Sequence, residues 1–172
     1  MKNKKHALLF ASLVCLLVVS GCAQKTAISS DKLLADSTFS DGSKIAVTIR
    51  NTTWCAEIAR SDAVKERGLS GRQNLSPHGG MLFLFSEAST PFFWMKDMHF
   101  DLDLVWLSND QVVDISRNIP YPRGAFDDAT LPRYTPKTQT NMVLEVTAND
   151  AADIEPGDSV TLKTTCVETP SS

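Results

Sequence analysis

The chain has 172 residues, of which 42% are hydrophobic and 22% are charged, and its formal net charge is −3. This length suits a single domain with one core once an N-terminal segment is set aside. Beyond that N-terminal segment, no basic run remains that would neutralise phosphates, so neither nucleic acids nor anionic lipid head groups are expected as partners.

Residues 1–21 have the pattern of a lipoprotein signal peptide. Three lysines precede an apolar run over 7–19, which is shorter than the roughly 20 residues of a membrane-spanning helix. The run ends in Val-Ser-Gly-Cys at 19–22, which resembles the bacterial lipobox. We therefore predict lipidation at Cys22. The alternative is an ordinary signal peptide that is cut elsewhere and leaves Cys22 as an ordinary thiol.

A lipidated Cys22 would anchor the domain in a membrane of the cell envelope through its acyl chains. Ala23 follows the cysteine, and in Gram-negative sorting a residue other than Asp there favours the outer membrane. The expected location in such a host is the outer membrane, facing the periplasm. Removal of 1–21 takes three of the 17 basic residues and none of the 20 acidic ones, which leaves a net charge near −6.

Two cysteines remain after this processing, Cys55 and Cys166. Outside the cytoplasm an even pair favours a disulfide, and one that closes a loop of more than a hundred residues could stabilise the fold by about 4 to 5 kcal/mol. The alternative is two free thiols or a soft metal site, although the CxxC spacing typical of such a site is absent.

The chain divides into a flexible tether over 22–43, a single β domain over 44–168 and a tail over 169–172. The tether is rich in Ser, Asp, Thr and Lys and has no sustained period. Alternating apolar residues then predict strands near 44–49 and at 54–59. A short helix follows at 63–67, with Ser61 or Asp62 as its cap and Gly68 as its left-handed exit.

Further strands are expected in the second half of the domain, and the apolar run at 81–85 should be buried on both of its faces. A turn at 108–110 makes a hairpin, 118–140 is a long loop of the kind that is commonly functional, and 151–154 forms a helical turn. The predicted strands lie at 81–85, 92–98, 100–107, 111–115, 142–146 and 160–167. Many strands and little helix predict a mostly β fold, a compact jelly-roll-like sandwich or barrel with one or two short helices.

Four segments, in order, resemble an uncharacterised prokaryotic family, domain of unknown function 192. They are AVKERGLSGRQNL, GGMLFLF, PFFWMKDMHFDLDLVWLSNDQVV and NMVLEVTANDAADIEPGDSV. The resemblance covers about 44–165 and implies a small, mostly β domain with no established activity, cofactor or catalytic residue. The family's hallmark positions fall on 66–69, 80–83, 93–96, 102–103, 144–145 and 157–158. Asp97, Met98 and Asp101 depart from the family pattern, as does the absence of cysteines from the long loop.

The stretch 91–107 concentrates polar groups in an apolar setting. If it were one strand, its odd positions would place Asp97, His99, Asp101 and Asp103 on one face. Adjacent groups such as His99 and Asp101 could share a metal ion if the long loop supplied a third ligand from Asp127 or Asp128. The alternative is a solvent-facing polar strip between apolar ends. A bulge near 98–99 would weaken both interpretations.

Asp103 lies deep within an apolar run, where a carboxylate usually accepts backbone or arginine hydrogen bonds; a role as a general acid or base is the alternative. Lys96 is either a surface lysine beside Trp94 or, if buried, an activated amine. The aromatic residues of 92–94 and of the long loop could form core or line a groove.

We therefore predict a lipid-anchored envelope protein and favour a binding or accessory module over an enzyme. It would have no cofactor, and its partner would be an envelope protein or a small ligand. The predicted recognition surface comprises Arg67, Lys96, Asp103, Arg123 and Tyr134. The alternative is a metal-dependent or acid/base enzyme that uses His99, Asp101 and Asp103.

Overall fold

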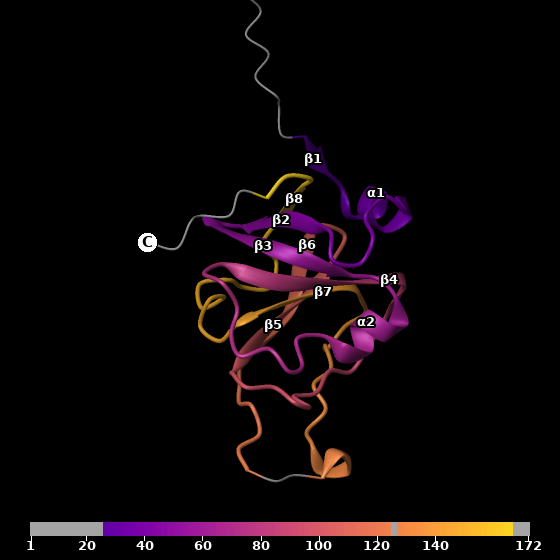
Figure 1. Cartoon of the computed structure of the whole chain (residues 1–172). Coiled ribbons are helices and arrows are strands. Elements are labelled where there is room, and N and C mark those ends of the chain that lie inside the picture. Colours follow the sequence, from indigo (N-terminus) through magenta and orange to yellow (C-terminus); the bar gives the residue numbers. More distant parts are fainter. Residues whose placement is uncertain (1–25, 125–126, 167–172) are drawn as a thin grey trace, which may run out of the picture.

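The computed structural model describes residues 26–124 and 127–166 (Figure 1). The predicted signal peptide, Cys22 and the tail over 169–172 lie outside these residues. Within the described part of the chain, no helix is long and apolar enough to cross a membrane.

The prediction of a mostly β domain is confirmed, because strands far outnumber helices along the described chain. The elements in chain order are β1 (Ala27–Ile28), α1 (Ser30–Ala35), β2 (Lys44–Ile49), β3 (Thr52–Ala59), α2 (Asp62–Arg67), β4 (Gly79–Ser89), β5 (Leu102–Ser108), β6 (Gln111–Ile119), the 3-10 turn η1 (Asp128–Thr130), β7 (Thr140–Thr147) and β8 (Val160–Lys163). Asn109 and Asp110 adopt positive φ at the predicted turn between β5 and β6, as tight hairpins require.

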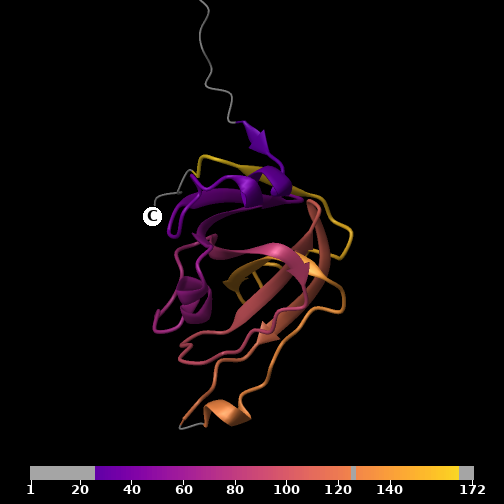
Figure 2. The ribbon, with the colours of Figure 1, turned by 90° about the vertical axis from the view of Figure 1, so that its right-hand side faces the viewer.

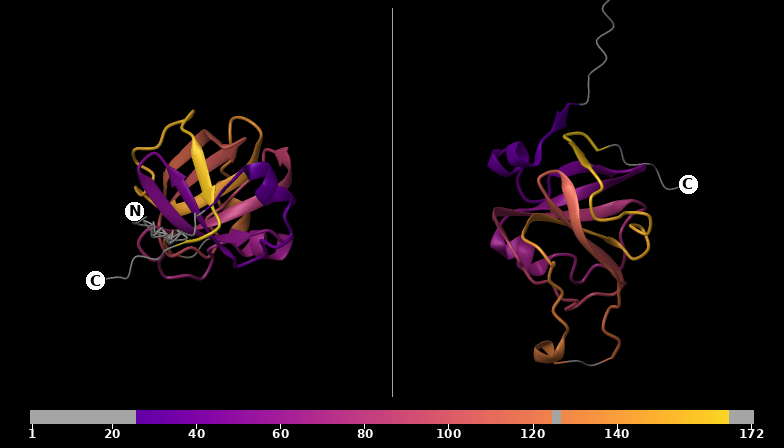
Figure 3. Two further views of the ribbon diagram at one scale, coloured as in Figure 1. Left: turned by 90° about the horizontal axis from the view of Figure 1, so that it is seen from above. Right: turned by 180° about the vertical axis from the view of Figure 1, so that it is seen from behind.

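The eight strands form one mixed sheet in the order β1-β8-β2-β3-β4-β7-β5-β6. The sheet curls strongly (Figures 2 and 3), and an isolated bridge joins Gln111 at the start of β6 to Ser159 just before β8. Backbone hydrogen bonds at the same place run from Val112 N to Asp158 O at 2.9 Å and from Val160 N to Asp110 O at 2.8 Å. Because β6 and β8 do not pair along their lengths, the sheet is an open curl and not a closed barrel.

One pair of neighbouring strands, β3 and β4, runs parallel, whereas the others are antiparallel. Parallel neighbours need a crossover connection, and here it consists of α2 and the loop over 68–78. The predicted caps of α2 are confirmed: Ser61 Oγ accepts a hydrogen bond from Val64 N, and Gly68 ends the helix with a φ of 51°. This crossover covers part of one face of the sheet.

Two apolar clusters lie on opposite faces of the sheet. The first takes side chains from all eight strands, with Trp54, Leu82 and Leu144 among them, as expected for the inside of a curled sheet. The second lies on the outer face and contains Met81, Phe83, Leu104, Trp106 and Val143, with neighbours from α2 and the 90–101 segment. The alternation along β4 explains the division, since Met81 and Phe83 point outward while Leu82 and Leu84 point inward.

The prediction of a flexible tether up to residue 43 is wrong from residue 27 onward, because β1 and α1 pack onto the sheet. Leu33 of α1 is fully buried. The Arg60 guanidinium donates hydrogen bonds to the carbonyl oxygens of Leu33, Leu34, Asp36 and Phe39. Polar composition alone could not reveal this docking, which depends on a residue in a distant part of the chain.

The prediction of a strand at 92–98 is also wrong. Only Phe93 makes a β-bridge, to Tyr134 in the long loop, and Asp97 has a left-handed φ of 55° within a turn. That turn breaks the alternation of faces, so the polar residues of 97–103 do not form one strip.

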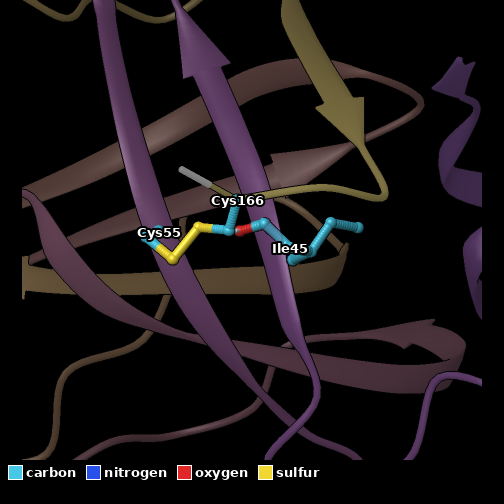
Figure 4. Close-up of a disulfide and its surroundings, with 3 residues drawn as sticks. All are labelled: Ile45, Cys55 and Cys166. Atoms are coloured by element: carbon cyan, nitrogen blue, oxygen red, sulfur yellow. Dashed lines mark hydrogen bonds between the residues drawn. A yellow bond between two sulfur atoms is a disulfide. The ribbon is translucent and has the colours of Figure 1, made fainter. Parts of the chain in front are cut away.

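The predicted disulfide between Cys55 and Cys166 is present (Figure 4). Its Cα atoms are 5.5 Å apart and its closed loop spans 111 residues. The bond joins β3 to the segment that follows β8, which supports the pairing of both strands with β2. In the chain-entropy treatment a loop of this length stabilises the fold by about 4 to 5 kcal/mol.

Candidate functional site

A cavity of about 450 Å³ opens on the outer face of the sheet, between the C-terminal end of α2 and the 90–101 segment. Its walls are mostly apolar and aromatic. Its lining residues are Lys65, Glu66, Arg67, Gly68, Leu69, Ser70, Phe83, Phe85, Pro91, Phe92, Phe93, Trp94, Met98 and Glu145. A concave apolar site with a few polar groups is the usual form of a small-ligand pocket.

Glu145 of β7 is the buried polar group of this pocket. The register places it between Met81 of β4 and Leu104 of β5, so its side chain emerges among apolar neighbours. The residue is 5% exposed, and its Oε2 atom has no hydrogen-bond partner. Burial raises the pKa of Glu145 to about 8, against a smaller lowering by Arg72. The carboxyl is therefore mostly protonated at pH 7.

Gly68 brings the backbone of the crossover against this carboxyl group. A Cβ at this position would lie 3.3 Å from the Phe83 ring and 3.7 Å from Glu145 Oε2. The positive φ of Gly68 is also one that side chains other than glycine's rarely adopt. Two independent reasons thus favour glycine here: the helix exit and the close approach to the pocket.

Two hydrogen bonds hold the walls of the pocket together. Ser70 Oγ donates to Lys96 O at 2.7 Å, and Gly71 N donates to Asp97 O at 2.8 Å. They tie the loop after α2 to the turn of the 90–101 segment. The width of the pocket is therefore fixed by contacts between two segments far apart in sequence.

Aromatic rings and cations alternate around the pocket and its rim. Lys65 Nζ lies 5.1 Å from the centre of the Phe85 ring, and the Arg133 guanidinium lies 4.1 Å from the centre of the Trp94 ring. Phe92 is 59% exposed, although it is large and apolar. The Phe93 ring makes edge-to-face contacts with the rings of Phe83 and Trp106. The rim is thus an exposed aromatic surface on a rigid support.

A second acidic group, Glu57 of β3, lies on the same face of the sheet as Glu145. Met81 of β4 lies between them, because it pairs with Glu57 on one side and with Glu145 on the other. Unlike Glu145 it is fully paired, because the Arg72 guanidinium donates to its two oxygens at 2.8 and 2.7 Å. This pairing lowers the pKa of Glu57 below its ordinary value. The charge of Arg72 is therefore already neutralised by Glu57.

The five residues of the predicted recognition surface lie in different parts of the structure. Arg67 lines the pocket, Lys96 lies over the Trp94 ring, and the backbone of Tyr134 pairs with that of Phe93. Arg123 stacks on Tyr121 in the long loop. Asp103 is 1% exposed and accepts hydrogen bonds from Asn118 N and Ala151 N, on the face of β5 opposite Leu104.

Lys96 does not have the environment of an activated amine. A hydrogen bond and ion pair with Asp128 of the long loop raise its pKa above the ordinary value. Burial raises the pKa of Tyr134 as well. Both residues connect the rim of the pocket to the long loop.

The proposed metal ligands are engaged in other ways. Asp101 accepts a hydrogen bond from Tyr121 N at 2.9 Å, and Asp127 caps η1 by accepting from Ala129 N. His99 is exposed. Over residues 26–124 and 127–166, no group of three or more His, Cys, Asp or Glu side chains is arranged to hold a metal ion.

Our reasoning from the sequence missed Glu145 as a functional residue and treated it only as a family hallmark. One signal was available, because an acidic residue stands within the apolar strand segment Met142–Val146 on the face of Val143. What made it a pocket residue is the crossover that passes over β7, and that arrangement is not a local property of the sequence.

Comparison with known proteins shows which family the chain belongs to. Residues 45–162 match the family model of domain of unknown function 192, described as an uncharacterized ACR. The match covers most of the chain, and the protein therefore belongs to this family. A search of curated protein sequences finds no match.

Two solved structures are similar to this one. A protein of unknown function from Novosphingobium aromaticivorans is 30% identical, with a TM-score of 0.60 over 68% of this chain and 84% of that chain. A protein from Sinorhizobium meliloti described as a proposed transcription regulator is 25% identical, with a TM-score of 0.61 over 70% of this chain and 95% of that chain.

Proposed function

We propose that the protein is a lipid-anchored binding module of the cell envelope, which holds a small ligand or a partner's side chain in the pocket of Glu145. The observation that supports this function best is the unpartnered carboxyl oxygen in the wall of an aromatic cavity. Burial of a polar group without a hydrogen bond costs about 2 kcal/mol or more. A site that retains such a group is suited to binding a ligand that supplies the missing contact.

The shape of the pocket favours binding over a purely structural role. The inner cluster already provides a continuous core from all eight strands. The outer cluster adds an exposed aromatic rim, in which Phe92 contacts solvent and Arg133 covers Trp94. Exposed aromatic groups with nearby cations are typical of recognition surfaces.

Two observations support the proposed location. The disulfide between Cys55 and Cys166 suits an oxidising compartment. Thr26 is four positions after Cys22, a reach of at most about 14 Å. The strand β1 lies at the end of the molecule opposite the long loop (Figure 1). An acyl group on Cys22 would thus direct the long loop away from the membrane.

The anchor can be tested by detergent phase partition of the protein from its host. We expect wild type in the detergent phase and Cys22→Ser in the aqueous phase, with an acylated N-terminal peptide in the wild type only. Equal partition of the two proteins would exclude anchoring through Cys22, and binding in the pocket would then be tested separately.

The binding function can be tested with a fragment library and ¹H–¹⁵N spectra of the full-length protein in mild detergent. Ligands should shift the amide signals of Gly68, Ser70 and Phe93 and leave those of β2 and β8 unchanged. Phe92→Ala should weaken these ligands. Hits that map only to other surfaces would contradict a pocket function.

A further inference from the structure

We propose that the pocket selects ligands that carry one ammonium group on an apolar body, and that this ammonium pairs with the ionised carboxylate of Glu145. The inference rests on the proposed binding function and specifies its ligand class. On binding, the Glu145 carboxyl proton passes to solvent and the ligand keeps its own charge, so that the bound pair is neutral.

The first support is the missing partner of Glu145. Its Oε2 atom lies close to Gly68, where an added Cβ would be 3.7 Å from it, and it accepts no hydrogen bond. The strand neighbours Met81 and Leu104 offer no donor from their side chains. A ligand that places an N–H group at this atom would satisfy it, and an ammonium group does so with a charge-assisted bond.

The second support is the charge balance around the carboxyl group, because the cations on every neighbouring segment are already paired or lie at the exposed rim. Arg72 is bound to Glu57, Lys65 to Asp62 and Lys96 to Asp128. Arg67 and Glu66 are exposed on α2, and Asp97 is exposed in the facing turn. An ionised Glu145 would therefore lack a compensating cation until a ligand supplied one.

The third support is the aromatic lining. Phe83, Phe85, Phe92, Phe93 and Trp94 contribute ring surfaces to one cavity. Aromatic faces attract cations through their quadrupoles and bind apolar groups by burial of area. An ammonium on an apolar body uses both properties at once.

The inference predicts how binding depends on pH. Burial raises the pKa of the free Glu145 carboxyl to about 8, and a bound cation lowers it again. At pH 7 most molecules must release a proton to bind, whereas at pH 9 few must. The apparent affinity for an ammonium with a pKa of about 10 should thus rise roughly tenfold from pH 7 to pH 9.

The test is calorimetric titration of the full-length protein in mild detergent with 2-phenylethylamine and with its uncharged analogue 2-phenylethanol. At pH 7 in two buffers of different ionisation enthalpy, the amine should release nearly one proton. Glu145→Gln should weaken the amine at least tenfold and abolish proton release. Glu87→Gln, at an exposed carboxylate of β4 that does not line the pocket, is the matched control and should bind as wild type does.

A second arm separates two sources of the ammonium group. An acetylated Gly-Lys-Gly amide represents a lysine side chain of a partner protein, and its norleucine analogue is the uncharged control. If the peptide binds more tightly than the small amine and with the same proton release, the natural partner is a protein. If only the small amine binds, the ligand is a metabolite.

The outcomes distinguish the ligand class from the binding function. Binding of 2-phenylethanol as tight as that of the amine, or tight amine binding by Glu145→Gln, would overturn the ammonium inference and leave a pocket that binds neutral ligands. The same holds if only uncharged fragments bind there. Failure of every probe and fragment at the pocket would overturn both proposals. A wild-type amide spectrum for Glu145→Gln would show that its fold is retained.

Discussion

Asp103 and Glu145 are buried carboxyl groups on opposite faces of the sheet, and only Asp103 receives hydrogen bonds for both of its oxygens. Asp103 on β5 is 1% exposed, and its Oδ1 and Oδ2 atoms accept backbone hydrogen bonds from Asn118 N at 2.7 Å and Ala151 N at 3.3 Å. Glu145 on the neighbouring strand β7 is 5% exposed and has an oxygen with no partner. Burial alone therefore does not identify a candidate site, whereas burial without a partner beside a cavity does.

The difference follows from what covers each face. The Asp103 side is closed by the end of β6 and the turn at 148–154, which bring backbone N–H groups to the carboxylate. The Glu145 side is covered by α2, whose exit glycine contributes close packing but no hydrogen bond to this group. The first arrangement fixes the fold, and the second leaves an acceptor available to a ligand.

The largest expected effect is the loss of Asp103. Asp103→Ala removes the acceptor of the backbone N–H groups of Asn118 and of the buried Ala151, and we expect a loss of about 4 kcal/mol in the free energy of unfolding. Urea denaturation measures this loss, and Asp153→Ala, exposed in the same turn, should change stability little. Similar small losses from both variants would contradict a structural role for Asp103.

Glu145→Gln should have the opposite effect, and one that depends on pH. The folded pKa of about 8 is above the ordinary 4.5, so the folded state holds an extra proton between these values and the protein loses stability as pH rises. From pH 5 to pH 8 the wild type should lose roughly 3 kcal/mol relative to Glu145→Gln. Parallel stability curves for the two proteins would show that Glu145 is ionised or paired.

Gly68→Ala should affect both stability and binding. The methyl group meets the Phe83 ring and adopts an unfavourable φ, for an expected loss of about 2 kcal/mol. Gly71→Ala is the control, because its φ is also positive but its Cβ would meet no atom within 4 Å. Only the Gly68 variant should weaken pocket ligands in a titration followed by amide signals. If Gly71→Ala weakened them equally, backbone strain would explain the effect.

The smallest effect concerns Arg72, which links the paired and unpaired acids of the outer face. Arg72→Ala removes a partly exposed ion pair with Glu57, for about 1 kcal/mol or less. It also removes the cation that lowers the pKa of Glu145, so the titration of the ¹³C carboxyl signal should move to higher pH. Arg67→Ala, on the exposed rim, is the comparison, and a shift of the same size there would make the effect of Arg72 non-specific.

Local patterns predicted several elements of this fold well. Alternating apolar residues gave β2 and β3, and the cap at Ser61 with the exit at Gly68 gave α2, because these signals lie within a few residues of one another. The disulfide followed from the number of cysteines that remain after processing. The predicted lipidation at Cys22 lies outside the described residues and stays a prediction.

Features that depend on distant contacts were not predictable in the same way. The helix α1 forms from a polar segment because Arg60 binds its carbonyl groups and Leu33 reaches the core. The segment at 92–98 has the composition of a strand, yet Asp97 turns the chain and no strand pairs with it. Glu145 became a candidate site only because a parallel crossover passes over its strand.

The position of β8 in the sheet also determines when the sheet can be completed during synthesis. Its residues, Val160–Lys163, pair with β2, more than a hundred residues earlier in the chain. During synthesis β2 therefore lacks one neighbour until nearly the whole chain has left the ribosome, and sheets with such distant pairings fold slowly. Until the sheet is complete, the partly synthesised chain exposes an apolar strand edge at β2.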